Sequence, residues 1–182
     1  METKQKNYFK YFAGFIFVLF LRLIPLRAPN VEMILATQMP FSRVYGKFLA
    51  FSFGFFSIIF YDLITSTLGV WSLVTSFTYG FIGLWAVSYF NKKSDNKSFT
   101  YVKFAIMSTI VYDAVTGLIV GPMIFHQQFS VALAGQIPFT IIHLLGNTIF
   151  ASMLSPAIYN FLIRKRSSEN KIFTNIFKPK TI

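Results

Sequence analysis

Residues 103–164 read KFAIMSTIVYDAVTGLIVGPMIFHQQFSVALAGQIPFTIIHLLGNTIFASMLSPAIYNFLIR. Between Lys103 and Arg164 lie 60 residues, of which only Asp113 is charged. A soluble domain is about one quarter charged, so a run of this kind would leave it without a polar surface. A helix needs about 20 apolar residues to cross the hydrocarbon of a bilayer. The run therefore predicts two transmembrane helices.

A second run of this kind lies between Lys47 and Lys92, where 44 residues contain one charge, Asp62. The whole chain is 54% hydrophobic and 13% charged. Near the N-terminus, basic residues precede an apolar segment at residues 11–21, and no small-residue cleavage site follows it. This segment is expected to be a retained first helix rather than a signal peptide. The predicted fold class is all-α, a polytopic membrane protein.

We expect a six-transmembrane-helix bundle over residues 1–166, followed by a cytoplasmic tail at 167–182. The six spans are expected at residues 9–24, 30–41, 46–65, 70–90, 101–120 and 136–163. The second span is short and contains Glu32, and Gly121-Pro122 is expected to break the fifth. Loops are expected at residues 91–98 and 126–128. The tail is either a short amphipathic helix on the inner membrane surface or a frayed end.

Basic residues are expected to gather on the cytoplasmic side of a membrane protein. With six spans and the N-terminus inside, 15 of the 17 Lys and Arg residues lie inside. A five-span layout with the N-terminus outside gives 14 inside and 3 outside. The distribution of charge therefore predicts that the protein lies in the cell membrane with its C-terminus on the cytoplasmic side. It leaves the number of spans open.

The segments FYDLITS (60–66) and VYDAVTG (111–117) share the pattern Tyr-Asp-x-x-Thr. Transporters are often built from internal repeats, although a match this short also arises by chance. Asp62 and Asp113 are the only acidic residues in the last four expected spans. A carboxylate in hydrocarbon is costly, so it usually faces a cavity or a partner. Each aspartate is therefore either a ligand contact or a hydrogen-bonding group between helices.

The last expected span carries four polar residues at steps of 4, 3 and 4, which places them on one helical face. They are Gln136, Thr140, His143 and Asn147. A single polar residue in a membrane helix often serves helix packing. A stripe of four that ends near a loop is more typical of a cavity wall.

Two further candidates for ligand contact are Trp71 and Thr75, at the outer end of the fourth span. Trp71 is placed either to stack on a flat ligand ring or to lie among lipid headgroups. Arg27, in the first outer loop, is placed to meet a ligand anion, to pair with Glu32 or to touch lipid phosphate.

Enzyme signatures are absent from the sequence, which contains no GxxxxGK[ST], HExxH or GxSxG pattern. Two histidines and no cysteines argue against a metal site. We therefore expect no catalytic residue, no cofactor, no metal and no nucleic-acid partner. Energy for any transport has to come from ions or from another protein.

The stretch YDLITSTLGVWSLVTSFTYGFIGLWA (61–86) resembles the substrate-binding (S) components of energy-coupling factor (ECF) transporters of the vitamin-uptake type. IPFTIIHLLGNTIFASMLSPAIYNFL (137–162) is similar to their last helix, which opens with a Pro and closes with a Pro and a basic stop. RAPNVE (27–32) fits their first outer loop and second helix.

The resemblance implies a six-helix bundle that binds a vitamin or similar small molecule near its outer face. It also implies docking on a transmembrane scaffold subunit that two cytoplasmic ATPase subunits drive. Many members carry Ala-x-x-x-Ala on the first helix for this docking. Here Ala13 and Gly14 are followed by phenylalanines at 15, 17 and 20, which leaves the docking surface open.

We therefore expect a substrate-capture subunit for a small micronutrient. The substrate-binding residues expected are Asp62, Trp71, Thr75, Asp113, Gln136, Thr140, His143, Asn147 and Arg27. Two alternatives remain. A structural membrane protein of the cell-shape type predicts no outward cavity, and a self-sufficient ion-coupled carrier predicts transport without an ATPase.

Overall fold

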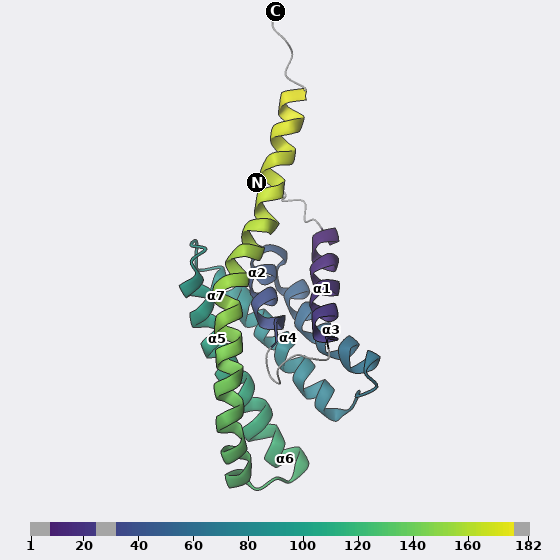
Figure 1. Ribbon diagram of the computed structural model, residues 1–182, viewed down its shortest axis with the longest axis vertical. Helices are drawn as coiled ribbons and strands as arrows, with labels where there is room; N and C mark the ends of the chain where they lie inside the picture. Colours follow the sequence, from purple (N-terminus) through teal and green to yellow (C-terminus); the bar gives the residue numbers. More distant parts are fainter. Residues whose placement is uncertain (1–7, 25–31, 177–182) are drawn as a thin grey trace, which may run out of the picture.

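The protein is all-helical in a computed structural model that describes the backbone of residues 8–24 and 32–176 and the side chains as far as Leu162. This confirms the predicted fold class of a helical membrane protein. The elements are α1 (Tyr8–Arg22), α2 (Ile34–Tyr45), α3 (Lys47–Ile64), α4 (Val70–Phe90), α5 (Ser98–Asp113), η1 (Ala114–Val120), α6 (Gly121–Phe125) and α7 (Phe129–Ile176). Helix α7 runs along the whole bundle and extends beyond it toward the C-terminus (Figure 1).

Four helical segments among the described residues are long and apolar enough to cross a membrane: Lys47–Ile64, Val70–Phe90, Ser98–Phe125 and Phe129–Leu162. Helix α2 has 12 residues, which at 1.5 Å per residue is about 18 Å, well short of the roughly 30 Å of hydrocarbon. Helix α1, with 15 residues, is also short. The structure therefore supports a polytopic protein with four clear spans, and it does not establish six.

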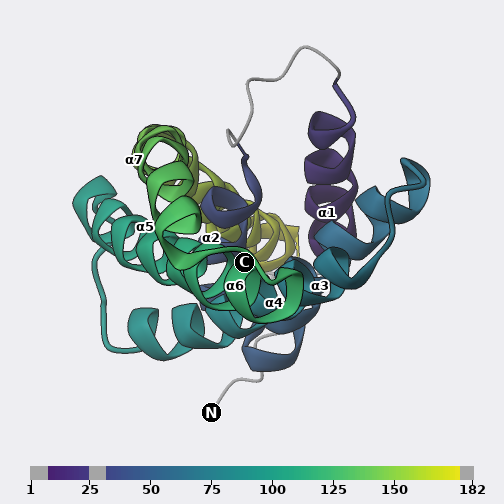
Figure 2. The same cartoon turned by 90° about the horizontal axis from the view of Figure 1, so that it is seen from below.

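Helix α2 lies in the middle of the bundle, surrounded by the other helices (Figure 2). Most of its side chains are buried, Gln38 and Met39 completely. Pro40 lies inside the helix and has no N–H to bond the carbonyl four residues earlier, which belongs to Ala36. The hydroxyl of Ser155 on α7 donates to that Ala36 carbonyl at 2.7 Å. A hydrogen bond from a neighbouring helix thus satisfies the group that the proline leaves free.

The buried amide of Gln38 holds α3 and α4 together. Its Nε2 donates to the carbonyl of Ala50 on α3 at 3.0 Å and to that of Tyr79 on α4 at 2.9 Å. A Cβ at Gly83 would collide with the Ala50 carbonyl, so only glycine allows this approach of the two helices. The centre of the bundle is therefore tightly packed.

The end of the bundle that carries the loop 91–97, here called the loop end, is tied down by Arg43 of α2. Its guanidinium donates to the carbonyls of Asp95 and Lys93 at 3.0 and 3.2 Å and to the Tyr101 hydroxyl at 2.8 Å. It also lies over the ring of Tyr159 on α7, 4.1 Å from the centroid. These contacts tie α2, α5, α7 and the loop to one another at this end.

The expected break of the fifth span at Gly121-Pro122 is wrong. The helix continues to Phe125, with a π-helical stretch, η1, between α5 and α6. Pro122 follows η1 directly, and the wider π-helical turn before it changes the hydrogen-bond pattern that a proline would interrupt in a regular α-helix. The chain then turns at His126, whose φ of 54° is left-handed, and residues 126–128 form the expected loop.

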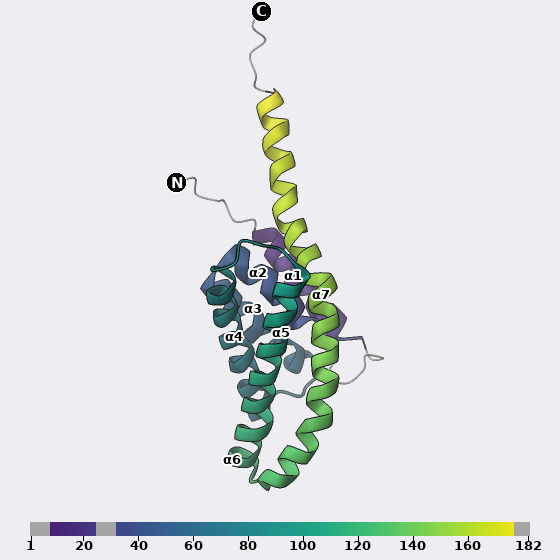
Figure 3. The ribbon, with the colours of Figure 1, turned by 90° about the vertical axis from the view of Figure 1, so that its left-hand side faces the viewer.

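The last helix begins at Phe129, seven residues before the expected start at 136. Helix α5 and the middle part of α7 lie side by side along the bundle (Figure 3). Helix α7 also continues without a break past residue 166, as far as Ile176. The placement of residues 167–182 at a membrane surface stays a prediction.

Candidate functional site

A cavity of about 220 Å³, here called the polar cavity, lies at the end of the bundle where α1 and α3 end and α4 begins, opposite the loop 91–97. It lies between α1, the start of α2, α3, α4, the α5–η1 junction and α7. Its lining combines four aromatic rings with charged and hydroxyl groups. The lining residues are Arg22, Glu32, Ile58, Asp62, Trp71, Thr75, Tyr79, Tyr112, Thr116, Phe139 and His143.

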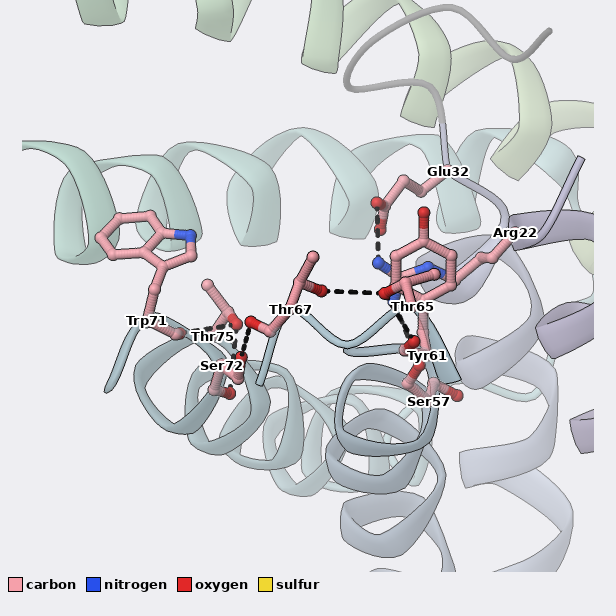
Figure 4. A network of polar contacts seen from close by, with 9 residues as sticks. All are labelled: Arg22, Glu32, Ser57, Tyr61, Thr65, Thr67, Trp71, Ser72 and Thr75. Carbon is pink, nitrogen blue, oxygen red and sulfur yellow. Dashed lines mark hydrogen bonds and ion pairs between the residues drawn. The ribbon is translucent and has the colours of Figure 1, made fainter. Parts of the chain in front are cut away.

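Arg22, at the end of α1, is an almost fully buried cation on the wall of the polar cavity. Its guanidinium donates to Glu32 Oε1 and to the carbonyl of Ser57, at 3.2 and 3.1 Å. The same group lies 4.2 Å above the ring of Tyr61 (Figure 4). A buried charge is tolerated when it is paired and hydrogen-bonded in this way. The ion pair also fixes the end of α1 against the start of α2.

A line of hydroxyl groups along the turn between α3 and α4 positions Trp71 (Figure 4). The hydroxyls of Thr65 and Thr67 lie 2.8 Å apart, and Ser72 donates to the carbonyl of Thr67 at 3.4 Å. Thr75 donates to the carbonyls of Trp71 and Ser72 at 2.9 and 3.2 Å. Ser72 Oγ also accepts from the N–H of Gly69 at 3.1 Å, which caps the start of α4. The indole of Trp71 remains 44% exposed at the cavity mouth.

Asp113 and His143 form a buried pair between α5 and α7. The carboxylate Oδ1 lies 2.8 Å from His143 Nδ1, and the residues are 1% and 3% exposed. A carboxylate accepts from Nδ1–H, so in the neutral ring Nε2 is left as an acceptor. The ring of Tyr112 meets the imidazole edge-on at 5.6 Å. His143 lines the cavity and Asp113 does not, so Asp113 lies behind the histidine as seen from the cavity.

A second cavity of about 490 Å³, here called the side cavity, adjoins the first and shares Trp71, Thr116 and Phe139 with it. It lies between η1, α6 and the start of α7. Its other lining residues are Gly117, Gly121, Phe125, Gln127, Ala132, Gly135 and Gln136. π-Helical stretches often occur at functional sites, and η1 faces both cavities.

The structure brings most of the expected site residues to one end of the bundle. Asp62, Trp71, Thr75 and His143 line the polar cavity, and Gln136 lines the side cavity, where it donates to Thr140 at 3.1 Å. Three others lie behind the cavity walls: Asp113, Thr140 and Asn147. Arg27 lies outside the described residues.

Asn147 joins helices rather than facing a cavity. Its Nδ2 donates to the hydroxyl of Thr109 on α5 at 2.8 Å, and its side chain is buried. The polar stripe of α7 is therefore divided. The part nearer the start of α7, with Gln136 and His143, faces the cavities, and Asn147, nearer the C-terminus, holds α7 against α5.

Sequence reasoning did not select several residues of the polar cavity: Arg22, Glu32, Tyr79, Tyr112, Thr116 and Phe139. A usable signal existed for Arg22, because an arginine at the end of a membrane helix needs a partner. Tyr112 and Thr116 belong to the repeated Tyr-Asp-x-x-Thr pattern. Tyr79 follows Trp71 and Thr75 at steps of four residues, which indicates a shared helical face, whereas for Phe139 the sequence offers no signal among so many aromatic residues.

The family model described as ECF-type riboflavin transporter, S component, matches residues 11–160, a range that includes every residue lining the polar cavity. No curated protein and no solved structure matches the chain. The match confirms the resemblance seen in residues 61–86 and 137–162. The family is a transporter subunit and not an enzyme. This multi-pass membrane protein belongs to the family of S components of ECF transporters.

Proposed function

We propose that the protein captures riboflavin, or a vitamin with a similar flat ring and polar chain, in the polar cavity and the adjoining side cavity. The match of residues 11–160 to the riboflavin transporter S component carries the proposal. The lining supports it, because aromatic faces and a few placed polar groups are typical of sites for ligands of this chemistry.

The two cavities offer complementary surfaces for such a ligand. Around the shared residues Trp71 and Phe139, aromatic rings present faces and edges against which a flat heteroaromatic ring can pack. Asp62, Thr75 and His143 present acceptors and a hydroxyl to the hydroxyl groups of a sugar-like chain. The Arg22–Glu32 ion pair closes the wall on the side of α1.

Within the described part of the chain, the two cavities share no lining residue with a separate cavity at the loop end. This separation supports capture followed by movement of the whole bundle, rather than a channel through it. Arg43 binds the loop 91–97 across that end. In this proposal all six spans cross the cell membrane, both termini are cytoplasmic, and the cavities open outward. The protein docks on a scaffold subunit driven by two cytoplasmic ATPases, which supply the energy.

Helix α1 offers few small residues for that docking. The ring of Phe41 packs against Gly14, which therefore faces α2. Phe9, Phe12, Phe17 and Phe20 are exposed on the outer side of the helix. If the scaffold docks on α1, it meets a phenylalanine-rich surface in place of the small residues used elsewhere in the family.

Riboflavin binding is tested by titrating the purified protein in detergent with riboflavin and following flavin fluorescence, which stacking quenches. We expect saturable binding that weakens about tenfold in Trp71→Leu, because stacking on an aromatic side chain contributes roughly 1–3 kcal/mol. Trp85→Leu is the matched control. Trp85 is the other tryptophan of the chain and packs against Phe104, away from both cavities.

No saturable binding by a correctly folded sample would overturn riboflavin as the substrate. Equal loss in both tryptophan variants would remove Trp71 from the site. Ribitol and the isolated isoalloxazine ring, tested separately, show whether both parts of the vitamin are recognised.

The six-span topology is tested by cysteine labelling, which has no background because the chain contains no cysteine. Single cysteines at Ser94 and Gln127 are treated with a membrane-impermeant maleimide in intact cells. We expect labelling at position 127 and none at 94. A cysteine at Glu2 decides the span count, because five spans place it outside and six place it inside.

A further inference from the structure

A third cavity of about 430 Å³ lies at the loop end of the bundle, between the end of α4 and the start of α5. It shares no residue with the two cavities at the opposite end. Basic side chains dominate its lining. The lining residues are Tyr89, Lys92, Lys93, Ser94, Asp95, Lys97, Phe99, Thr100 and Lys103.

Positive charge in this basic cavity is left largely uncompensated. Four lysines face a single carboxylate, that of Asp95, and this carboxylate accepts a hydrogen bond from the Thr100 hydroxyl at 3.1 Å. Within the part of the chain that the structure describes, none of the four lysines forms an ion pair with a carboxylate. Clustered lysines without a counter-charge raise the local positive potential and attract an anion.

The walls of the basic cavity are held in place rather than formed by a free loop. Asn96 donates to the carbonyl of Pro156 at 3.3 Å and to Asn160 Oδ1 at 2.9 Å, both on α7. Arg43 binds the carbonyls of Asp95 and Lys93. The start of α5 has no side-chain cap among the described residues, and the positive end of its helix dipole adds to the potential.

The position of the basic cavity identifies the source of the anion. Both helices that form it are candidate membrane spans, and the cavity lies where they reach the membrane boundary. Phe99 is 66% exposed at its rim, and the ammonium of Lys103 lies 4.4 Å from the centre of that ring. A lysine beside an exposed aromatic ring matches a ligand with an anionic head and an apolar tail.

We propose that this cavity binds the phosphate of an anionic phospholipid, with the lysines on the headgroup and Phe99 against the acyl chains. The site does not depend on the vitamin-binding function. Bound lipid would anchor the α4–α5 hairpin at the anionic leaflet while the opposite end of the bundle remains open to its ligand.

The test is native mass spectrometry of the full-length protein in detergent with added phosphatidylglycerol or phosphatidylcholine. We expect phosphatidylglycerol to bind in preference, and Lys97→Gln/Lys103→Gln to weaken it about fivefold for each lysine removed. Lys47→Gln is the control, because Lys47 is an exposed lysine at the same end of the bundle but outside the cavity.

Competition between the phospholipid and glycerol 3-phosphate shows whether the site takes a lipid phosphate or a soluble phosphate. Glycerol 3-phosphate, which has the head without the tails, should compete weakly. If it displaces the lipid at equal concentration, the site takes a soluble phosphate and the lipid proposal fails. Equal binding of both lipids, or equal loss in the Lys47 control and the cavity variant, also overturns it.

Discussion

The two Tyr-Asp-x-x-Thr segments share one local hydrogen bond and differ in what surrounds them. In each, the threonine hydroxyl donates to the tyrosine carbonyl one turn earlier, at 2.9 Å for Thr65 and 2.8 Å for Thr116. Asp62 lies half-buried in the last turn of α3, on the wall of the polar cavity. Asp113 is buried and bonded to His143.

This difference arises from where each segment lies in its helix. Asp62 comes two residues before the end of α3, so its carboxylate reaches the cavity mouth. Asp113 lies in the middle of a longer helical segment, packed against α7. A buried carboxylate needs a partner, and α7 supplies the imidazole. The shared sequence pattern thus determines the hydrogen bond within each segment, while the neighbouring helices determine the burial and the partner of its aspartate.

The largest expected effect is on stability. Asp113→Ala should lower the free energy of unfolding by about 2 kcal/mol, since it removes a buried hydrogen bond to a charged group. Asp62→Ala, which leaves a half-exposed position, should change it by no more than about 0.5 kcal/mol. Thermal unfolding of both variants in detergent measures the contrast. Equal thermal midpoints for the two variants would break the distinction drawn between the two aspartates.

The next effect is on ligand affinity. His143→Ala should weaken riboflavin binding roughly tenfold, because it removes a cavity-facing hydrogen-bonding group. His126→Ala is the matched control: it removes the other histidine, which lies in the turn before α7 and lines neither cavity. Fluorescence titration measures both affinities.

Folding of the His143→Ala variant is checked by its thermal midpoint, because it leaves Asp113 unpaired. Asp113→Asn keeps an acceptor for Nδ1–H and should retain most of the affinity. Unchanged binding in a folded His143→Ala sample would place the ligand away from the Asp113–His143 pair.

The smallest expected effect is on riboflavin affinity when either of the two threonines that make the same local hydrogen bond is replaced. Thr116→Val should lower riboflavin affinity about threefold, because Thr116 lines both cavities. Thr65→Val should leave it unchanged, since Thr65 is exposed on the turn and lines neither cavity. Isothermal titration calorimetry resolves a difference of this size. Equal losses would indicate that the shared hydroxyl bond, and not the cavity position, matters for binding.

The sequence predicted the helices better than the site. Charge-free runs and turn residues located α3 and α4 to within one residue at each end. The prediction of a helix break at Pro122 was wrong, because a π-helical stretch before it lets the helix continue. At the site, the stripe from Gln136 to Asn147 was recognised as one face, yet periodicity did not show that Asn147 bonds α5.

What the sequence determined by itself is the class of protein: apolar runs long enough to span a bilayer, basic residues between them, and polar side chains on one face of the last helix. These properties are local, because they depend on residues within a few helical turns. The tertiary structure alone decided that Arg22 and Glu32 share a cavity with His143, and that Asp113 pairs with a histidine 30 residues away. Hydrogen-bond partners of buried groups come from other helices, and only their packing selects them.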